Sequence, residues 1–180
     1  MSVSKPFPRS YWVVPEKILA GQFPGDADDD KRRERIEALF NCGVRTIINL
    51  QEESEIEHDP LLLKEYRSLF ESAGKVNNAE VKFHRISIKD FSTPSTETMK
   101  QILDTVDAEV AAGHTLYIHC WGGIGRTGMV VGCFLKRHGM AGDDVLDKIA
   151  QLRHDDAAKE RKSPETPEQE AFVINWLKGM

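Results

Sequence analysis

One segment, His119-Cys-Trp-Gly-Gly-Ile-Gly-Arg-Thr-Gly128, combines a nucleophile, a cation and several glycines at a spacing that suits the binding of one anion. Five residues separate Cys120 from Arg126, so both side chains can face a single tetrahedral oxyanion. Glycines permit the positive φ angles with which successive backbone N–H groups point inward. The guanidinium adds a planar fork that matches two oxygens of a phosphate group. The residues expected to surround such a group are Trp121, Gly122, Gly123, Ile124, Gly125 and Arg126.

The same surroundings act on the sulfur of Cys120. A thiol at a helix N-terminus, among inward N–H donors and near a guanidinium, has a pKa well below the ~8.5 of a free thiol. We therefore expect Cys120 to be a thiolate nucleophile at neutral pH without a separate base. Thr127 is expected to donate its hydroxyl to that sulfur, which helps the thiolate to leave when a thiophosphoryl intermediate breaks down. His119 is expected to set the hydrogen bonding of the loop and not to transfer protons.

The pattern around this loop predicts the elements that position it. Residues 115–119 read as a strand and residues 127–138 as an apolar helix, so the loop lies between a strand end and a helix start, which is the architecture of an anion site. Further strands are expected at 11–14, 17–20, 44–50 and 81–88, and further helices at 26–40, 61–70, 93–112, 142–153 and 167–178. These elements predict a single α/β domain with a central, mainly parallel or mixed sheet flanked by helices.

Local signals set several of the predicted ends. Thr93 and Pro94 fit the N-cap and the first position of a helix, and the cluster from Gly74 to Asn78 is expected to interrupt helical structure. Gly43 is expected to end the helix of residues 26–40. The buried stripe of that helix is predicted to consist of Arg33, Ile36, Leu39 and Phe40.

The length of 180 residues fits one domain with a full hydrophobic core and is too short for two ordinary ones. We expect a loose arm over residues 1–10 and one catalytic domain over residues 11–180. The chain has 24 basic and 29 acidic residues, a formal net charge of −5. That balance makes nucleic acid an unlikely partner, but it does not exclude an anionic ligand held by one local positive site.

Three cysteines, Cys42, Cys120 and Cys133, are too few and too scattered for a disulfide framework or a C-x-x-C zinc site. The N-terminal segment lacks the apolar stretch of a signal peptide, and no segment approaches the ~18 apolar residues of a membrane span. We expect a reduced, cytoplasmic protein that has no membrane partner and is a monomer.

The run HCWGGIGRTG resembles the HC-x5-R-[ST] signature of cysteine-dependent protein tyrosine phosphatases, and the short chain resembles their dual-specificity branch, near the kinase-associated and related bacterial phosphatases. The resemblance implies a dual-specificity phosphatase-like fold and hydrolysis of a phosphomonoester through a cysteinyl-phosphate intermediate. It also implies that no metal and no cofactor is needed. A bare C-x5-R would be less specific, because rhodanese-type sulfurtransferases and arsenate reductases share it.

The same resemblance assigns two further roles. Asp90 precedes Cys120 by 30 residues and stands ahead of a proline, as the family's general acid does on its mobile loop. It would protonate the leaving oxygen and then activate the water that hydrolyses the intermediate. Gln169, in Ser163-Pro-Glu-Thr-Pro-Glu-Gln169, resembles the glutamine that orients that water, although Glu165 stands where related sequences often have a first glutamine. Residues 51–80 match nothing specific in the family.

The substrate stays open at this point. A phosphotyrosyl or phosphoseryl/threonyl protein is favoured over a phosphoinositide or an inositol phosphate, because the loop contains no lysine, and over an RNA 5′ end, because the net charge is −5. Neighbouring Lys82, Arg85 and Lys89 are an alternative source of positive charge. Sulfur transfer or arsenate reduction is disfavoured by Asp90, since neither reaction needs an acid for an alkoxide. A phosphate-binding pseudophosphatase is disfavoured because the nucleophile, the cation and the acid are all present.

Several single residues also keep a plain structural alternative. Trp121 can stack on a substrate ring or pack beneath the loop, and Gln169 can be simple helix surface. Cys42 and Cys133 are expected in the core, with a role as resolving thiol for oxidised Cys120 as the alternative. His114 and His119 are expected on opposite faces of one strand, which argues against a metal pair.

Overall fold

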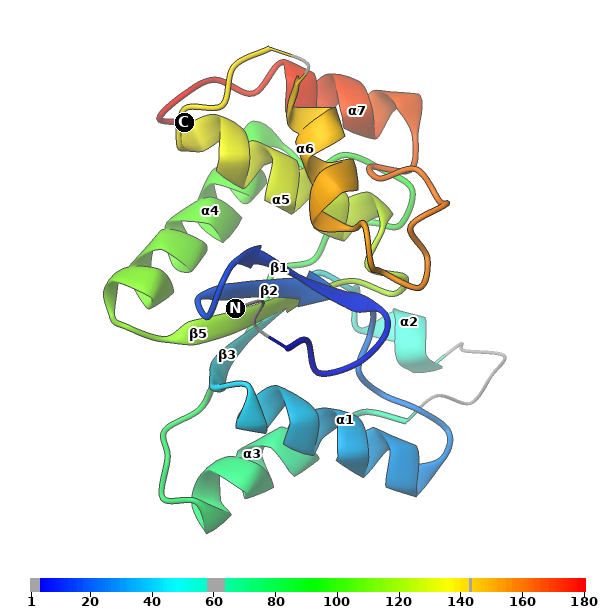
Figure 1. Ribbon diagram of the computed structural model, residues 1–180, viewed down its shortest axis with the longest axis vertical. Helices are drawn as coiled ribbons and strands as arrows, with labels where there is room; N and C mark the ends of the chain where they lie inside the picture. The colour runs from blue at the N-terminus through cyan, green and yellow to red at the C-terminus, as the bar shows by residue number, and fades with distance from the viewer. Residues whose placement is uncertain (1–3, 58–63, 143) are drawn as a thin grey trace.

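The structure, a computed structural model, describes residues 4–57, 64–142 and 144–180 (Figure 1). Its strands are β1 (Ser10–Val14), β2 (Ile18–Gly21), β3 (Val44–Asn49), β4 (Lys82–Arg85) and β5 (Thr115–His119). Its helices are α1 (Asp29–Asn41), α2 (Ser54–Glu57), α3 (Arg67–Val76), α4 (Thr96–Ala111), α5 (Gly125–Arg137), α6 (Asp144–Leu152) and α7 (Pro167–Ile174).

The five strands form one mixed sheet in the order β1-β2-β5-β3-β4. β1 pairs with β2 in the antiparallel sense, and every other pair is parallel. The register places His119 opposite both Gly21 and Asn49. The chain segments that leave β2, β3, β4 and β5 therefore emerge along one edge of the sheet, where α/β proteins bind their ligands. The predicted α/β fold is confirmed.

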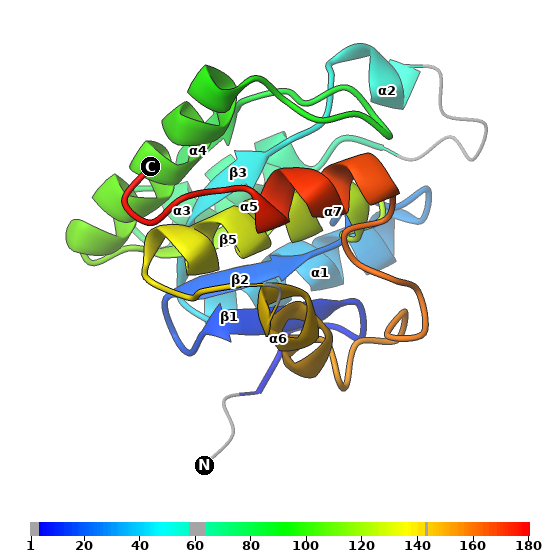
Figure 2. The same cartoon turned by 90° about the horizontal axis from the view of Figure 1, so that it is seen from above.

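Helices cover both faces of the sheet (Figures 1 and 2). α5 packs against α4, α6 and α7 on one face, whereas α1 and α3 pack together on the other. Successive residues of β3 alternate between these layers, because Ile47 joins the apolar cluster that contains Leu39, and Ile48 joins the cluster that contains Val106. Both faces of β3 are thus buried, which explains its continuous apolar sequence.

The helix predicted over residues 61–70 is wrong in its position. Residues 61–63 lie outside the described part of the chain, and α3 begins at Arg67 and continues through Gly74 to Val76. Gly74 is accommodated inside this helix for a packing reason, since a Cβ there would lie 2.9 Å from the carbonyl oxygen of Ala79. Asn78, at φ 49°, makes the turn after the helix.

Two other local predictions need correction. The N-cap of α4 is Ser95 and not Thr93, because the Ser95 hydroxyl accepts a hydrogen bond from the N–H of Thr98 at 3.1 Å. Arg33 does not belong to the buried stripe of α1, since its side chain is 58% exposed and pairs with Asp30. The apolar members of that stripe are buried as predicted, namely Ile36, Leu39 and Phe40.

The part of residues 1–10 that the structure describes lies against the domain and is not a loose arm. Phe7 is buried and meets the ring of Tyr117 edge-on at 5.9 Å. The carbonyl of Pro8 accepts a hydrogen bond from the N–H of Ala157, and Ser10 already belongs to β1. None of the described helices is both long and apolar enough to cross a membrane.

Candidate active site

Residues outside the loop between β5 and α5 hold it by donating hydrogen bonds to its carbonyl groups. The Trp121 carbonyl accepts from the N–H of Phe23 at 2.9 Å, the Gly122 carbonyl accepts from Arg9 at 2.7 Å, and the Ile124 carbonyl accepts from the Ser163 hydroxyl at 2.7 Å. In a trans peptide the N–H points opposite to the carbonyl. Each outward carbonyl therefore turns the next N–H, at positions 122, 123 and 125, toward the inside of the loop.

Gly123 shows why this loop needs glycine. Its φ is +70°, and a Cβ at this position would lie 2.3 Å from the carbonyl carbon of Gly21. No side chain fits that space, so a residue larger than glycine would push the loop away from the end of β2. Cys120, at the start of the loop, is 3% exposed.

Arg126 sits in the first turn of α5 and is 1% exposed. Its two terminal nitrogens bind both carboxylate oxygens of Glu55, at 2.5 and 2.9 Å, and one of them also donates to the Ile88 carbonyl at 3.1 Å. Burial alone would lower the pKa of Arg126, but the hydrogen bonds with Glu55 raise it above its ordinary value. Burial alone would raise the pKa of Glu55, and the hydrogen bonds from Arg126 lower it. The pair is therefore ionised.

Two donors in this site are buried and have no partner within the structure. They are Nε of Arg126 and the hydroxyl of Thr127, whose residue is fully buried. An unpartnered buried donor is costly, and native structures usually supply an acceptor. Both donors belong to the first turn of α5, whose N-terminus favours negative charge. They fit an anion bound in the loop.

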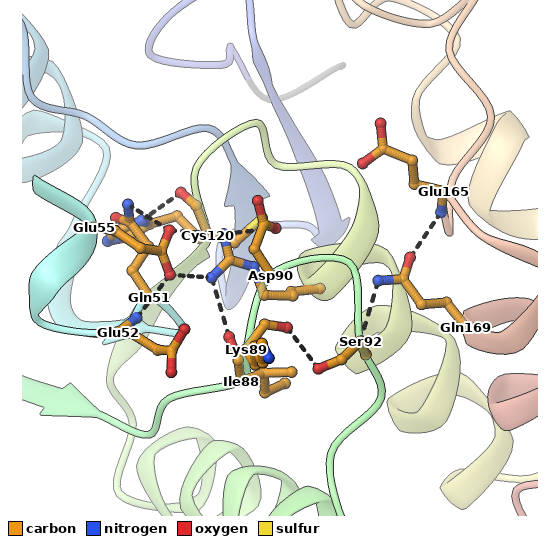
Figure 3. A network of polar contacts seen from close by, with 12 residues as sticks. Gln51, Glu52, Glu55, Ile88, Lys89, Asp90, Ser92, Cys120, Glu165 and Gln169 are labelled. Atoms are coloured by element: carbon orange, nitrogen blue, oxygen red, sulfur yellow. Dashed lines mark hydrogen bonds and ion pairs between the residues drawn. The ribbon is translucent and has the colours of Figure 1, made fainter. Parts of the chain in front are cut away.

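Asp90 lies opposite the loop, beside Arg126 (Figure 3). Its Oδ1 is 3.0 Å from a terminal nitrogen of Arg126, and its side chain is 49% exposed. The next residue, Phe91, has a positive φ of 54° and is 64% exposed. A non-glycine residue in this conformation is strained, and such residues cluster at functional sites.

His119 is a fixed, neutral group behind the nucleophile. Its Nδ1 lies 3.0 Å from the Cys120 carbonyl, which can only accept, so Nδ1 carries the proton and Nε2 accepts from the hydroxyl of Tyr66 at 2.5 Å. Burial lowers the pKa of His119 to about 3. The histidine thus orients the backbone at Cys120. Because the ring is neutral at neutral pH, it does not act as a general acid.

Gln169 is 1% exposed and lies next to the loop. A Cβ on Gly125 would lie 2.9 Å from its Oε1, and its Nε2 donates to the Ser92 carbonyl at 3.3 Å. The reading of Gln169 as simple helix surface is therefore wrong. Glu165 lies beside it, and its carboxylate pairs with Arg161.

The other residues that the sequence singled out lie as follows. Trp121 is partly exposed and stacks on the buried ring of Phe23, with centroids 5.7 Å apart and planes at 7°. His114 binds Glu109 at 2.6 Å and does not meet His119. No group of three or more His, Cys, Asp or Glu side chains in the described ranges is placed to hold a metal ion.

The alternative role of Cys42 as a resolving thiol is not compatible with the fold. Cys42 precedes β3, at the opposite edge of the sheet from Cys120, and a five-residue strand spans about 16 Å. A disulfide requires Cα atoms within about 7 Å. Cys133 is buried on α5, as expected, and its alternative role as a resolving thiol stays a prediction.

Sequence reasoning missed Glu55 and Tyr66, both within residues 51–80. Glu55 belongs to α2, which follows β3, and β3 lies directly beside β5. The run Glu52-Glu53-Ser54-Glu55 after a buried strand was the available signal, because segments that follow neighbouring parallel strands share one edge. Tyr66 gave no signal in the sequence.

Comparisons with known proteins identify the family of this chain. A family model described as "Swiss Army Knife protein, DSP-PTPase phosphatase domain" matches residues 8–173. Dual specificity protein phosphatase CDC14B of Mus musculus is 26% identical over 185 residues, which covers 93% of this chain and 32% of that protein. Two other curated relatives are matched over 14% and 58% of their lengths, so the chain spans only part of these proteins.

Solved structures show the same fold. Kinase associated phosphatase superposes with a TM-score of 0.72 at 17% identity, covering 96% of this chain and 94% of that one. PTPMT1 in complex with PI(5)P superposes with a TM-score of 0.68 at 19% identity, covering 93% of each chain. The family match extends over nearly the whole chain, from β1 to α7. The chain therefore belongs to the DSP-PTPase family of cysteine-dependent phosphatases.

Proposed function

We propose that the protein hydrolyses phosphomonoesters through a cysteinyl-phosphate intermediate, with a phosphorylated tyrosine, serine or threonine side chain as substrate. The observation that carries the proposal is the convergence of Cys120, Asp90 and the buried guanidinium of Arg126 at the β5–α5 loop, where Nε of Arg126 has no partner among the described residues. The loop N–H groups and this guanidinium are the donors that a phosphate dianion requires.

In the first step the loop N–H groups and Arg126 bind the phosphate oxygens, and the thiolate of Cys120 attacks phosphorus in line. The S–P bond forms as the P–O bond to the leaving group breaks. Asp90, protonated, gives its proton to the leaving oxygen, so the product departs as a neutral alcohol or phenol. The substrate must displace the Asp90 carboxylate from Arg126, since the two lie 3.0 Å apart in the free protein.

In the second step the Asp90 carboxylate takes a proton from water, which attacks phosphorus and releases Cys120 as thiolate. Thr127, whose hydroxyl has no partner among the described residues before substrate binds and so does not yet contact the sulfur, donates it to that thiolate at this stage, and Gln169 orients the water. The Gln169 carboxamide has two N–H groups, of which one binds Ser92, so the second is available for this role. His119 stays neutral throughout and maintains the backbone at Cys120.

Charge around the site favours a phosphoprotein over a polyanionic lipid or inositol phosphate. Two of the lysines and arginines that could have formed a basic rim are already engaged, because Lys82 binds Glu109 at 3.2 Å and Arg85 faces Glu65 at 3.7 Å. Among the described residues that follow β3, Glu52 and Glu53 add negative charge instead. A phosphoinositide is the second candidate, because the similar fold of PTPMT1 was solved with PI(5)P.

The test is hydrolysis of an aryl phosphate in EDTA, with vanadate as inhibitor. We expect turnover to disappear in Cys120→Ser and to fall by about 10²–10⁴ in Asp90→Ala. Cys42→Ser is the matched control, since this partly exposed thiol lies at the far edge of the sheet and should be dispensable. Turnover that survives Cys120→Ser, or that needs added metal, would contradict the proposed chemistry.

A second experiment separates the substrates. A panel of phosphotyrosyl and phosphoseryl peptides, phosphoinositide vesicles, inositol phosphates and RNA 5′ ends is compared by kcat/KM. We expect the peptides to lead. A higher kcat/KM for a phosphoinositide than for every peptide would contradict a protein substrate but would leave the proposed mechanism unchanged.

A further inference from the structure

Asp90 is carried by a closed four-residue turn, Lys89–Ser92. The N–H of Ser92 and its hydroxyl both donate to the Lys89 carbonyl, at 3.2 and 2.8 Å. Phe91 completes the turn with its positive φ of 54°. Because two hydrogen bonds close the turn, it moves as a unit, and a contact made at Ser92 also positions Asp90.

The site holds this turn at both of its flanks (Figure 3). Before the turn, Arg126 donates to the Ile88 carbonyl at 3.1 Å. After Asp90, Nε2 of Gln169 donates to the Ser92 carbonyl at 3.3 Å. Arg126 belongs to the phosphate loop and its helix, whereas Gln169 belongs to α7, so the acid is tied to two separate elements.

Gln169 is itself fixed. Its Oε1 accepts from the N–H groups of Glu165 and Thr166, at 3.0 and 3.3 Å, and the Thr166 hydroxyl caps α7 in return. The same carboxamide lies against Gly125, where a Cβ would be 2.9 Å from Oε1 and 3.2 Å from Nε2. One buried side chain therefore contacts α7, the phosphate loop and the acid turn.

An open groove of about 320 Å³ lies beside the segment that follows the turn, between Thr93 and Thr96 on one side and Phe172 on α7 on the other. The hydrogen bond from Gln169 therefore links the acid turn to α7 next to a groove that side chains do not fill. Loss of this bond leaves room for the turn to move away from the loop.

We propose that Gln169 is a positioning residue for Asp90, which holds the acid turn against the phosphate loop and so controls protonation of the leaving group. This inference rests on the proposed phosphatase mechanism. It gives Gln169 a part in the first chemical step, when the proton of Asp90 passes to the leaving oxygen as the P–O bond breaks. That part is separate from orientation of water, which acts only after the intermediate has formed.

The kinetics distinguish these two parts. In this mechanism kcat/KM covers only the steps up to the cysteinyl-phosphate, so a residue that only orients water affects kcat and leaves kcat/KM unchanged. A residue that positions the acid affects kcat/KM, and it does so more for a poor leaving group, which needs the proton, than for an activated one.

The informative variant is Gln169→Glu. A carboxylate still accepts from the N–H groups of Glu165 and Thr166, so the cap of α7 is kept, but it cannot donate to Ser92. Its added charge weakens phosphate binding equally for every ester and leaves the ratio between esters unchanged. Gln169→Met, uncharged and of similar length, is the second variant. Thr166→Ala is the control, because it weakens the cap and leaves the bond to Ser92.

We expect Gln169→Glu to lower kcat/KM at least about tenfold more for phenyl phosphate than for an activated nitrophenyl phosphate. Gln169→Met should show the same selective loss, and Thr166→Ala should show none. In an Asp90→Ala background the Gln169→Glu change should alter kcat/KM for phenyl phosphate by less than about twofold, because the two residues act through one proton transfer.

The positioning role would be overturned if cooperatively folded Gln169 variants lost the same factor of kcat/KM for both esters. It would also be overturned if Gln169→Glu still lowered kcat/KM for phenyl phosphate to its full extent in the Asp90→Ala background. Turnover that survives Cys120→Ser would instead overturn the proposed function, so the two failures are distinguishable.

Discussion

The carboxylate of Glu55 and the guanidinium of Arg126 form a two-pronged ion pair, with oxygen–nitrogen distances of 2.5 and 2.9 Å. The pair uses both terminal nitrogens and leaves Nε free for a ligand. Glu55 therefore fixes the plane and the rotation of the Arg126 guanidinium without occupying Nε.

Glu55→Gln is expected to lower kcat/KM by about ten- to hundredfold, because one oxygen of the fork is replaced by a donor that opposes Arg126. The protein should still fold, since an amide oxygen keeps one of the two bonds. Steady-state kinetics on an aryl phosphate, with the exposed Glu34→Gln on α1 as control, measures the effect. Full activity in Glu55→Gln would show that Arg126 is positioned by the helix alone.

Two buried tyrosines make opposite predictions. The Tyr66 hydroxyl donates to His119, whereas the Tyr11 hydroxyl is buried without a partner in the structure. Tyr66→Phe leaves Nε2 of a buried histidine unsatisfied and should cost about 1–3 kcal/mol of unfolding free energy. Tyr11→Phe removes an unpaired polar atom and should cost nothing or stabilise.

Urea unfolding of both variants measures this difference, and 15N NMR of His119 tests its cause. We expect the Nδ1-protonated tautomer to dominate in both proteins, because the Cys120 carbonyl still needs a donor, and the Nε2 resonance to shift in Tyr66→Phe as its hydrogen bond is lost. Equal stabilities of the two variants would mean that the contact between Tyr66 and His119 contributes no net free energy.

The sequence predicted the β5–loop–α5 segment well because its signal is contiguous: strand, glycines and helix follow one another, and Cys120 and Arg126 belong to one stretch. Asp90 was singled out by the resemblance to the phosphatase family, and the structure places it beside Arg126. Glu55 was not found because only strand order brings it there. The register of β3 against β5 carries α2 to the loop, and a single sequence does not encode which strands are neighbours.

The start of α4 was mispredicted for a related reason. Thr93 and Ser95 are both good N-cap residues, and Thr93 has the more favourable Pro94 behind it. The acid turn ends at Ser92, where Gln169 holds the carbonyl. The chain leaves that tertiary contact extended, and the helix begins only at Thr96, so Ser95 becomes the cap.

Glu109 predicts how stability depends on pH. Burial alone would raise its pKa, but hydrogen bonds from His114, Thr46 and Lys82 lower it to about 2. A carboxyl whose pKa is depressed in the folded state stabilises fully above its ordinary value of about 4.5, and this stabilisation is lost as pH falls toward 2. We expect a contribution of about 2–3 kcal/mol at neutral pH.

Denaturant unfolding of the wild type and Glu109→Gln from pH 7 to pH 2 measures this contribution, because titrating groups that do not contact Glu109 cancel in the difference. The difference in unfolding free energy between the two proteins should be largest above pH 5 and should fall as the Glu109 carboxyl is protonated. Glu71→Gln is the control, since that exposed carboxylate pairs only with Arg67 on the surface of α3. A gap that stays constant with pH would contradict the depressed pKa.

The acidic residues Glu52 and Glu53 after β3 should favour substrates in which the phosphate group is flanked by positive charge. Glu52→Lys combined with Glu53→Lys changes the charge at this side of the site by four units. It should raise kcat/KM for inositol phosphates and phosphoinositide vesicles and lower it for a phosphopeptide with flanking lysines, each by about three- to tenfold at low salt. The matched pair Glu52→Gln with Glu53→Gln should change the logarithm of each kcat/KM by half as much.

The changes in kcat/KM should be smaller in 0.5 M salt, since a Debye length of about 4 Å screens charges at the rim. An unchanged ratio between the two substrates at low salt would mean that these carboxylates do not face the bound ester, and that selectivity resides elsewhere on the rim.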